Sequence, residues 1–192
     1  MDSKTLGQSL AVGDIVFVHI DILPFRKIAC DTMSWTNHVG IVTSIDGGEP
    51  IVSESTFPFS KHTKLSAFLK RSKDGRTTIK RLPQPITPEQ QHAIRMAANK
   101  RLRKFYDTGF NLASRRQFCS RFVHEILKEA LDVQVGKPQN LRELLTENPD
   151  ADMRFWRLWY FGRIPWERTT VTPASQLNDP ALTVVFDGNL AR

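Results

Sequence analysis

Cysteine is scarce in this sequence, which has two in 192 residues, and no apolar run is long enough to span a membrane. Cys30 and Cys119 lie far apart along the chain. The N-terminus carries an acid at Asp2 and lacks the apolar segment that secretory signals contain. These absences predict a cytoplasmic protein with no integral membrane segment, in which both thiols stay reduced.

Internal repeats and low-complexity segments are also absent. The hydrophobic fraction of 40% and the charged fraction of 24% are those of an ordinary globular protein, and the length fits one domain over residues 1–192. Lysine and arginine number 27 against 20 acidic residues, which gives a net charge of +7. This excess predicts an anionic partner, whether a substrate, a lipid head group or nucleic acid.

The apolar pattern predicts a hairpin near the N-terminus and two longer helices in the second half of the chain. The hairpin joins strands at 37–45 and 50–56 through a glycine-containing turn. A strand buried on both faces precedes it at 15–20, and 21–36 is a looser segment. Thr87 to Gln90 form a capping box that begins a helix ending near Lys104. Further elements are expected as an edge strand at 76–82, short helices at 65–69, 141–145 and 172–177, and a last strand at 182–186.

Cys119 stands at the head of the second long helix, at the edge of its apolar face. The positive end of the helix dipole and the nearby Arg115, Arg116 and Arg121 would favour the thiolate, which is the nucleophilic form of cysteine. On this helix alone, the commoner role of such a cysteine is that of a small buried hydrophobe. The apolar face is formed by Phe118, Phe122, Val123, Ile126, Leu127, Ala130 and Leu131.

A nucleophilic Cys119 needs a base, and His38 is the best placed histidine. His124 is nearest in sequence, but five residues along a helix turn it by about 140° away from Cys119. His38 begins the strand at 37–45, and Gly40 leaves space beside it on the same strand face. We therefore expect His38 to lie at a sheet edge, available to a thiol from another element.

Glu54 is an acid where a strand ordinarily places valine or threonine, since it follows Ile51 and Val52. A carboxylate bonded to the far nitrogen of His38 would explain it. A three-residue hairpin loop would put His38 and Glu54 on one face, whereas a two-residue loop would favour Ser53 or Ser55. The sequence leaves this register open, and an acid on a solvent-facing sheet surface is an equal alternative.

Five motifs in order resemble one family. The chain is similar to the circularly permuted papain-like enzymes of the NlpC type, in particular the YiiX and YebB proteins, from residue 10 to about 186. The motifs are Leu10-x-x-Gly13-Asp14-Ile15-Val16-Phe17, Asn37-His38-Val39-Gly40-Ile41-Val42, Val52-x-Glu54-Ser55, Tyr106-Asp107-x-x-Phe110 and Phe118-Cys119-Ser120-x-Phe122-Val123.

This resemblance implies an α+β fold in which an antiparallel sheet or small barrel packs against helices. It implies that Cys119 is the nucleophile, His38 the general base and Glu54 the orienting residue of an amidase, peptidase, lipid esterase or acyltransferase that works through a thioester. Tyr106 matches an aromatic position near the site. The basic charge adds Arg116 and Arg121 as candidate contacts for an anionic small-molecule, peptide or lipid substrate.

No cofactor or metal is expected, because no ligand pair has the spacing of a metal motif. A metal site of His38, Cys119 and His19 is a weak alternative. A stronger one is a basic, non-catalytic module that binds anionic membrane or nucleic acid through Lys100 to Lys104. Nucleic acid is the less expected partner, since no recognised motif is present. The aromatic stretch 155–166 is predicted to pack as core more than to line a groove.

Overall fold

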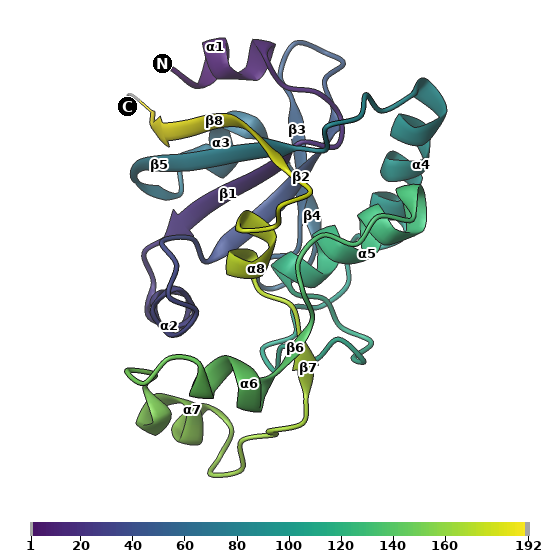
Figure 1. Ribbon diagram of the computed structural model, residues 1–192. Helices are drawn as coiled ribbons and strands as arrows, with labels where there is room; N and C mark the ends of the chain where they lie inside the picture. The colour runs from purple at the N-terminus through teal and green to yellow at the C-terminus, as the bar shows by residue number, and fades with distance from the viewer. Residues whose placement is uncertain (1, 191–192) are drawn as a thin grey trace.

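The computed structural model describes residues 2–190 and has a six-stranded antiparallel sheet at its centre (Figure 1). The strand order is β4-β3-β2-β1-β5-β8. The expected α+β class is therefore confirmed, with a sheet packed against helices. The strands are β1 (Ile15–Ile20), β2 (His38–Ser44), β3 (Ile51–Glu54), β4 (Lys61–Lys64), β5 (Ser72–Arg81) and β8 (Thr183–Asn189).

Helices cover both faces of this sheet. On one face α4 (Pro88–Asn99) and α5 (Cys119–Leu131) bury Ile94, Phe122 and Ile126 against the sheet. On the other face α1 (Ser3–Gln8) and α3 (Leu65–Leu69) bury Leu6 and Phe68. The remaining helices are α2 (Leu23–Asp31), α6 (Leu141–Thr146), α7 (Met153–Trp159) and α8 (Pro173–Leu177). None of the helices in residues 2–190 is long and apolar enough to cross a lipid bilayer.

The first four residues of β1, Ile15 to Val18, are all apolar and all buried. Ile15 and Phe17 belong to the core under α4 and α5, whereas Val16 and Val18 belong to the core under α1 and α3. A central strand with helices on both sides buries every side chain, so alternation of apolar and polar residues disappears. The predicted strand at 15–20, buried on both faces, is confirmed.

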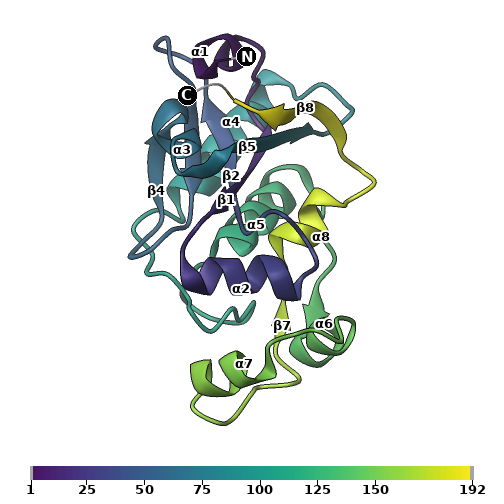
Figure 2. The ribbon, with the colours of Figure 1, turned by 90° about the vertical axis from the view of Figure 1, so that its left-hand side faces the viewer.

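The helices α6 and α7 form a projection at the end of the molecule opposite both termini (Figures 1 and 2). A two-stranded ribbon of β6 (Gln139–Asn140) and β7 (Thr169–Thr170) joins the projection to the main body. Leu145, Trp156 and Ile164 form its own small apolar core.

Three expectations about secondary structure were wrong. The stretch 21–36 contains the helix α2, because Pro24 lies in the first turn, where proline fits, and does not break the chain. The helix α4 ends at Asn99, and Arg103 has a positive φ of 60°, which no helix can continue through. The strand β5 is interior, because β8 returns from the C-terminal end of the chain to pair with its outer side.

Candidate active site

The first turn of α5 carries Cys119. Its apolar face packs into the main core, which fixes the axis of the helix and places the buried Cys119 side chain beside β2. Phe118 is the N-cap residue and provides no side-chain cap. The first N–H groups of the helix are therefore left for another acceptor near Cys119.

His38, the first residue of β2, is completely buried. Its Nε2 lies 2.6 Å from Oε2 of Glu54, while Nδ1 completes no hydrogen bond within residues 2–190. Burial alone would lower the pKa of His38. The nearby Cys119 side chain and the hydrogen-bonded carboxylate of Glu54 outweigh burial and raise that pKa to about 9. The ring is held between Phe25 and Phe68, whose centroids lie 5.9 and 5.6 Å away. His38 is thus held in one orientation beside the Cys119 side chain and the Glu54 carboxylate.

Glu54 is also completely buried, and its carboxylate forms hydrogen bonds with His38, Thr63 and Arg71. Thr63 Oγ1 donates to Oε1 at 2.6 Å, and Arg71 Nη2 lies 2.8 Å from both carboxylate oxygens. Burial raises the pKa of Glu54, but the hydrogen bond and charge of His38 and the charge of Arg71 lower it to about 2. A buried carboxylate stays ionised here because charged and hydrogen-bonding partners surround it.

The hairpin register brings His38 and Glu54 to one face. Ile41 pairs with Ser53, and a bulge between Val42 and Ser44 absorbs one residue before the connection at 45–50. Ser53 points the other way, where its Oγ bonds Thr43 Oγ1 and His62 Nδ1, each at 2.7 Å. Glu54 is therefore the residue that contacts His38.

Gly40 is a position where added volume has a clear expected effect. A Cβ there would lie 2.5 Å from Cγ1 of Val52 and 3.0 Å from Phe68, one of the rings that hold His38. We expect Gly40→Ala to lower the free energy of unfolding by about 1–3 kcal/mol through overpacking. Urea denaturation followed by circular dichroism measures this. Gly188→Ala is the matched control, because its nearest neighbour would be an ordinary 3.4 Å away. Equal midpoints for the two variants would contradict the expectation.

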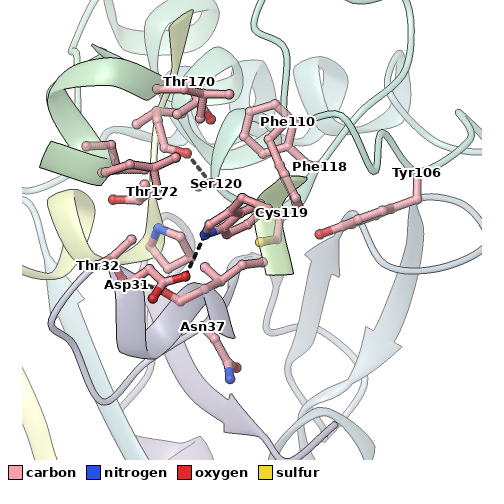
Figure 3. Close-up of a pocket in the computed structure, with 17 residues that line it drawn as sticks. Asp31, Thr32, Asn37, Tyr106, Phe110, Phe118, Cys119, Ser120, Thr170 and Thr172 are labelled. Atoms are coloured by element: carbon pink, nitrogen blue, oxygen red, sulfur yellow. Dashed lines mark hydrogen bonds between the residues drawn. The ribbon is translucent and has the colours of Figure 1, made fainter. Parts of the chain in front are cut away.

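Tyr106 is buried, and its hydroxyl points toward the sulfur of Cys119 (Figure 3). That hydroxyl completes no hydrogen bond within residues 2–190. Burial, and after it the proximity of the Cys119 side chain, raise the pKa of Tyr106 well above its usual value. Tyr106 is therefore a neutral hydrogen-bond donor beside the thiol.

A narrow pocket with a volume of about 40 Å³ opens beside Cys119. Among residues 2–190, no lysine, arginine or histidine lines it, and its walls come from α2, α6, α7 and the segment around β7. At one side the buried carboxylate of Asp31 accepts a 2.6 Å hydrogen bond from Trp156 Nε1 (Figure 3). The apolar lining residues are Ile28, Phe110, Phe118, Leu141, Leu144, Leu145, Trp156, Val171 and Pro173.

The two arginines expected at the site are not at this pocket. Arg121 is buried, pairs with Glu125 at 2.7 Å, and donates to the carbonyl oxygens of Asn111, Ser114 and Arg116. Arg116 is exposed. The structure therefore brings Cys119, His38, Glu54 and Tyr106 together and leaves Arg116 and Arg121 outside.

The basic stretch of the alternative hypothesis is partly neutralised. Lys100 lies 2.6 Å from Glu129, and Arg101 pairs with Glu125 and Glu129. Paired charges attract phosphate less than free ones do, so these contacts weaken the case for a nucleic-acid surface at this position.

Sequence reasoning missed Arg71 and Thr63, which hold Glu54, and Asp31, which borders the pocket. Arg71 lies in a lysine-rich stretch without a clear pattern, and nothing local marks it. Asp31 lies at the end of α2, a helix within the stretch 21–36 that the sequence predicts as irregular. Its burial raises its pKa, although the Asp152 N–H and Trp156 hydrogen-bond to it.

Comparison with known proteins places the chain in one family. A family model for permuted papain-like amidase enzymes of the YaeF/YiiX type matches residues 9–186. The uncharacterized protein YiiX of Escherichia coli strain K12 is 30% identical over 173 residues, which are 90% of this chain and 84% of that protein. The crystal structure of the metalloprotein yiiX from Escherichia coli O157:H7 is 28% identical and superposes with a TM-score of 0.87, covering 94% of this chain and 98% of that one. This chain therefore belongs to the YaeF/YiiX family of permuted papain-like amidases, and it is a papain-like hydrolase.

Proposed function

We propose that the protein cleaves an amide or ester bond with Cys119 as nucleophile, His38 as acid–base and Glu54 as the residue that orients His38. The observation that carries this proposal is the buried His38–Glu54 pair, 2.6 Å apart, beside a cysteine in the first turn of a helix. A buried histidine with one nitrogen bonded to a carboxylate and the other left for the sulfur matches the requirement of a cysteine nucleophile.

In the first step the Cys119 thiolate attacks the substrate carbonyl carbon. A carbon–sulfur bond forms, and the carbonyl electron pair moves to oxygen. The backbone N–H of Cys119 and the hydroxyl of Tyr106 are the proposed donors to this oxyanion. Tyr106 suits the role because its raised pKa keeps the proton on its oxygen.

In the second step the His38 imidazolium gives its proton to the leaving amine or alkoxide, and a thioester on Cys119 remains. Neutral His38 then takes a proton from water, and the resulting hydroxide equivalent attacks the thioester. Collapse releases the carboxylic acid and restores the thiolate and imidazolium. Glu54 keeps the ring in place and stabilises its positive charge throughout.

The pocket supports an uncharged apolar group on the substrate, in place of the anionic group expected from net charge. Burial of apolar surface contributes roughly 25 cal/mol per Å², whereas an unpaired charge in such a pocket would be strongly disfavoured. We therefore propose a substrate with an apolar acyl or side-chain group next to the scissile carbonyl.

The test uses p-nitroanilides and p-nitrophenyl esters of acetyl, butanoyl and hexanoyl groups, with a mass-spectrometric search for an acylated Cys119 after acid quenching. We expect kcat/KM to rise with chain length and the acyl adduct to map to Cys119. Leu144→Asp places a charge in the pocket wall and should lower kcat/KM for hexanoyl substrates at least tenfold. The acetyl substrate is the internal control and should change little. A uniform loss over all chain lengths would contradict the pocket assignment, and an unacylated Cys119 would contradict the mechanism.

The related yiiX crystal structure is described as that of a metalloprotein. Within residues 2–190 of this chain, no three His, Cys, Asp or Glu side chains gather so that they could hold one ion. The residues present do not fit a metal site, and no step of the proposed reaction passes through a metal.

A further inference from the structure

The end of α7 exposes two large apolar side chains to an unusual extent. Leu158 is 80% exposed and Phe161 is 95% exposed, and both border one open hollow with Phe155 and Trp159. Large apolar side chains grouped in this way on a surface usually mark a contact with a partner or a membrane. They lie on the projection at the end of the molecule opposite the termini (Figure 2).

The local fold holds these side chains outward. Trp156 turns inward from the same helix and is buried, and its indole is fixed by Asp31. Phe161 has a positive φ of 52° and is followed by Gly162 at 85°. A left-handed conformation is unfavourable for a bulky residue, and here it positions a phenyl ring that buries almost none of its surface in this chain. That ring is free to contact a surface outside the chain.

Basic residues flank the two apolar ones along the sequence. Arg154, Arg157 and Arg163 are exposed, and none forms a salt bridge with an acid among residues 2–190. Arg154 and Leu158 are four residues apart, so they follow one another along the same side of the helix. This group of five residues, which we name the α7 tip, comprises Arg154, Arg157, Leu158, Phe161 and Arg163.

We propose that the α7 tip docks on the surface of an anionic lipid bilayer. Leu158 and Phe161 would enter the boundary between head groups and acyl chains, and the three arginines would contact lipid phosphates. Interfacial segments bind membranes through this combination of buried apolar side chains and electrostatic attraction to anionic lipid. A nucleic-acid surface would explain the arginines but leave Leu158 without a role.

Docking in this orientation would bring the pocket beside Cys119 toward the lipid, since Trp156 and Leu145 of the same projection line that pocket. The docking proposal does not depend on the proposed reaction, because vesicle binding is measured without turnover. Cys119→Ser should bind vesicles like the unchanged protein, even though it lacks the nucleophile.

The test is co-sedimentation with sucrose-loaded vesicles of phosphatidylcholine and phosphatidylglycerol at 70:30, compared with vesicles of phosphatidylcholine alone. We expect binding to the mixed vesicles that weakens as salt rises. Leu158→Ser/Phe161→Ser should reduce the partition coefficient at least tenfold, and Arg154→Gln/Arg157→Gln/Arg163→Gln should remove the preference for anionic vesicles. Val184→Ser is the matched control, because Val184 is 59% exposed but lies on β8.

Three results would overturn the proposal. The first is equal vesicle binding by the Leu158→Ser/Phe161→Ser variant when its thermal unfolding is unchanged. The second is a dimer in lipid-free solution that this variant abolishes, since the α7 tip would then be a contact between copies of the chain. The third is binding to a 20-nucleotide single strand of RNA or DNA that is tighter than binding to vesicles and lost in the triple arginine variant.

Discussion

In a Cys30→Ser background, His38→Ala is expected to slow alkylation of Cys119 by iodoacetamide at pH 7 by about 100-fold and to reduce kcat by about 10²–10⁴-fold. His38 is the proposed base, and a base beside the thiol would favour the thiolate, which is the form that iodoacetamide alkylates. Cys30 is an exposed free thiol, so its removal leaves one reactive cysteine to measure. The rate of adduct formation at Cys119 is followed by mass spectrometry.

The matched control is His124→Ala. His124 lies on α5, as Cys119 does, but its Nδ1 lies 3.0 Å from the carbonyl oxygen of Val135, away from the site. In the His124→Ala variant, iodoacetamide should alkylate Cys119 at the unchanged rate. If Cys119 is alkylated as fast in the His38→Ala variant as in the His124→Ala variant while both stay folded, the pairing of Cys119 with His38 is refuted. The proposed mechanism is then refuted as well.

Glu54→Gln should lower kcat/KM by about 10²–10⁴-fold and move the alkaline limb of the pH profile to lower pH. In the unchanged protein the limb is expected at about 9, the pKa of His38, because leaving-group protonation needs the imidazolium. Removing the carboxylate removes one of the two groups that raise this pKa. Thr63→Val is the control: it loses one neutral hydrogen bond to Glu54 and keeps the charge. A limb that stays at about 9 in Glu54→Gln would show that Glu54 does not act on His38.

The same pKa values predict how stability depends on pH. The pKa of His38 is raised to about 9, so its contribution is complete below its ordinary value of 6.5 and is lost as pH rises through about 9. The pKa of Glu54 is lowered to about 2, so its contribution is complete above its ordinary value of 4.5 and is lost as pH falls through about 2. Both contributions are therefore complete between pH 4.5 and 6.5. The difference in thermal midpoint between Glu54→Gln and the unchanged protein should be largest in that window.

The sequence by itself determined the elements whose signal is local. The apolar run of β1, the capping box of α4 and the helical spacing that begins at Cys119 are patterns within a few residues of one another. Such patterns set secondary structure directly, because the chain must bury apolar faces and satisfy helix ends. The grouping of Cys119, His38 and Glu54 came from the resemblance of five motifs to one family, since local patterns alone left the partner of His38 open.

Only the tertiary structure decided how that site is completed. A bulge near Val42, which no local pattern announces, selects Glu54 over Ser53 as the partner of His38. Arg71 stabilises Glu54 from 17 residues away along the chain, and the pocket joins α2 to α6 and α7, more than 100 residues later. These contacts depend on how separate elements pack, and packing is a property of the whole chain that no short segment encodes.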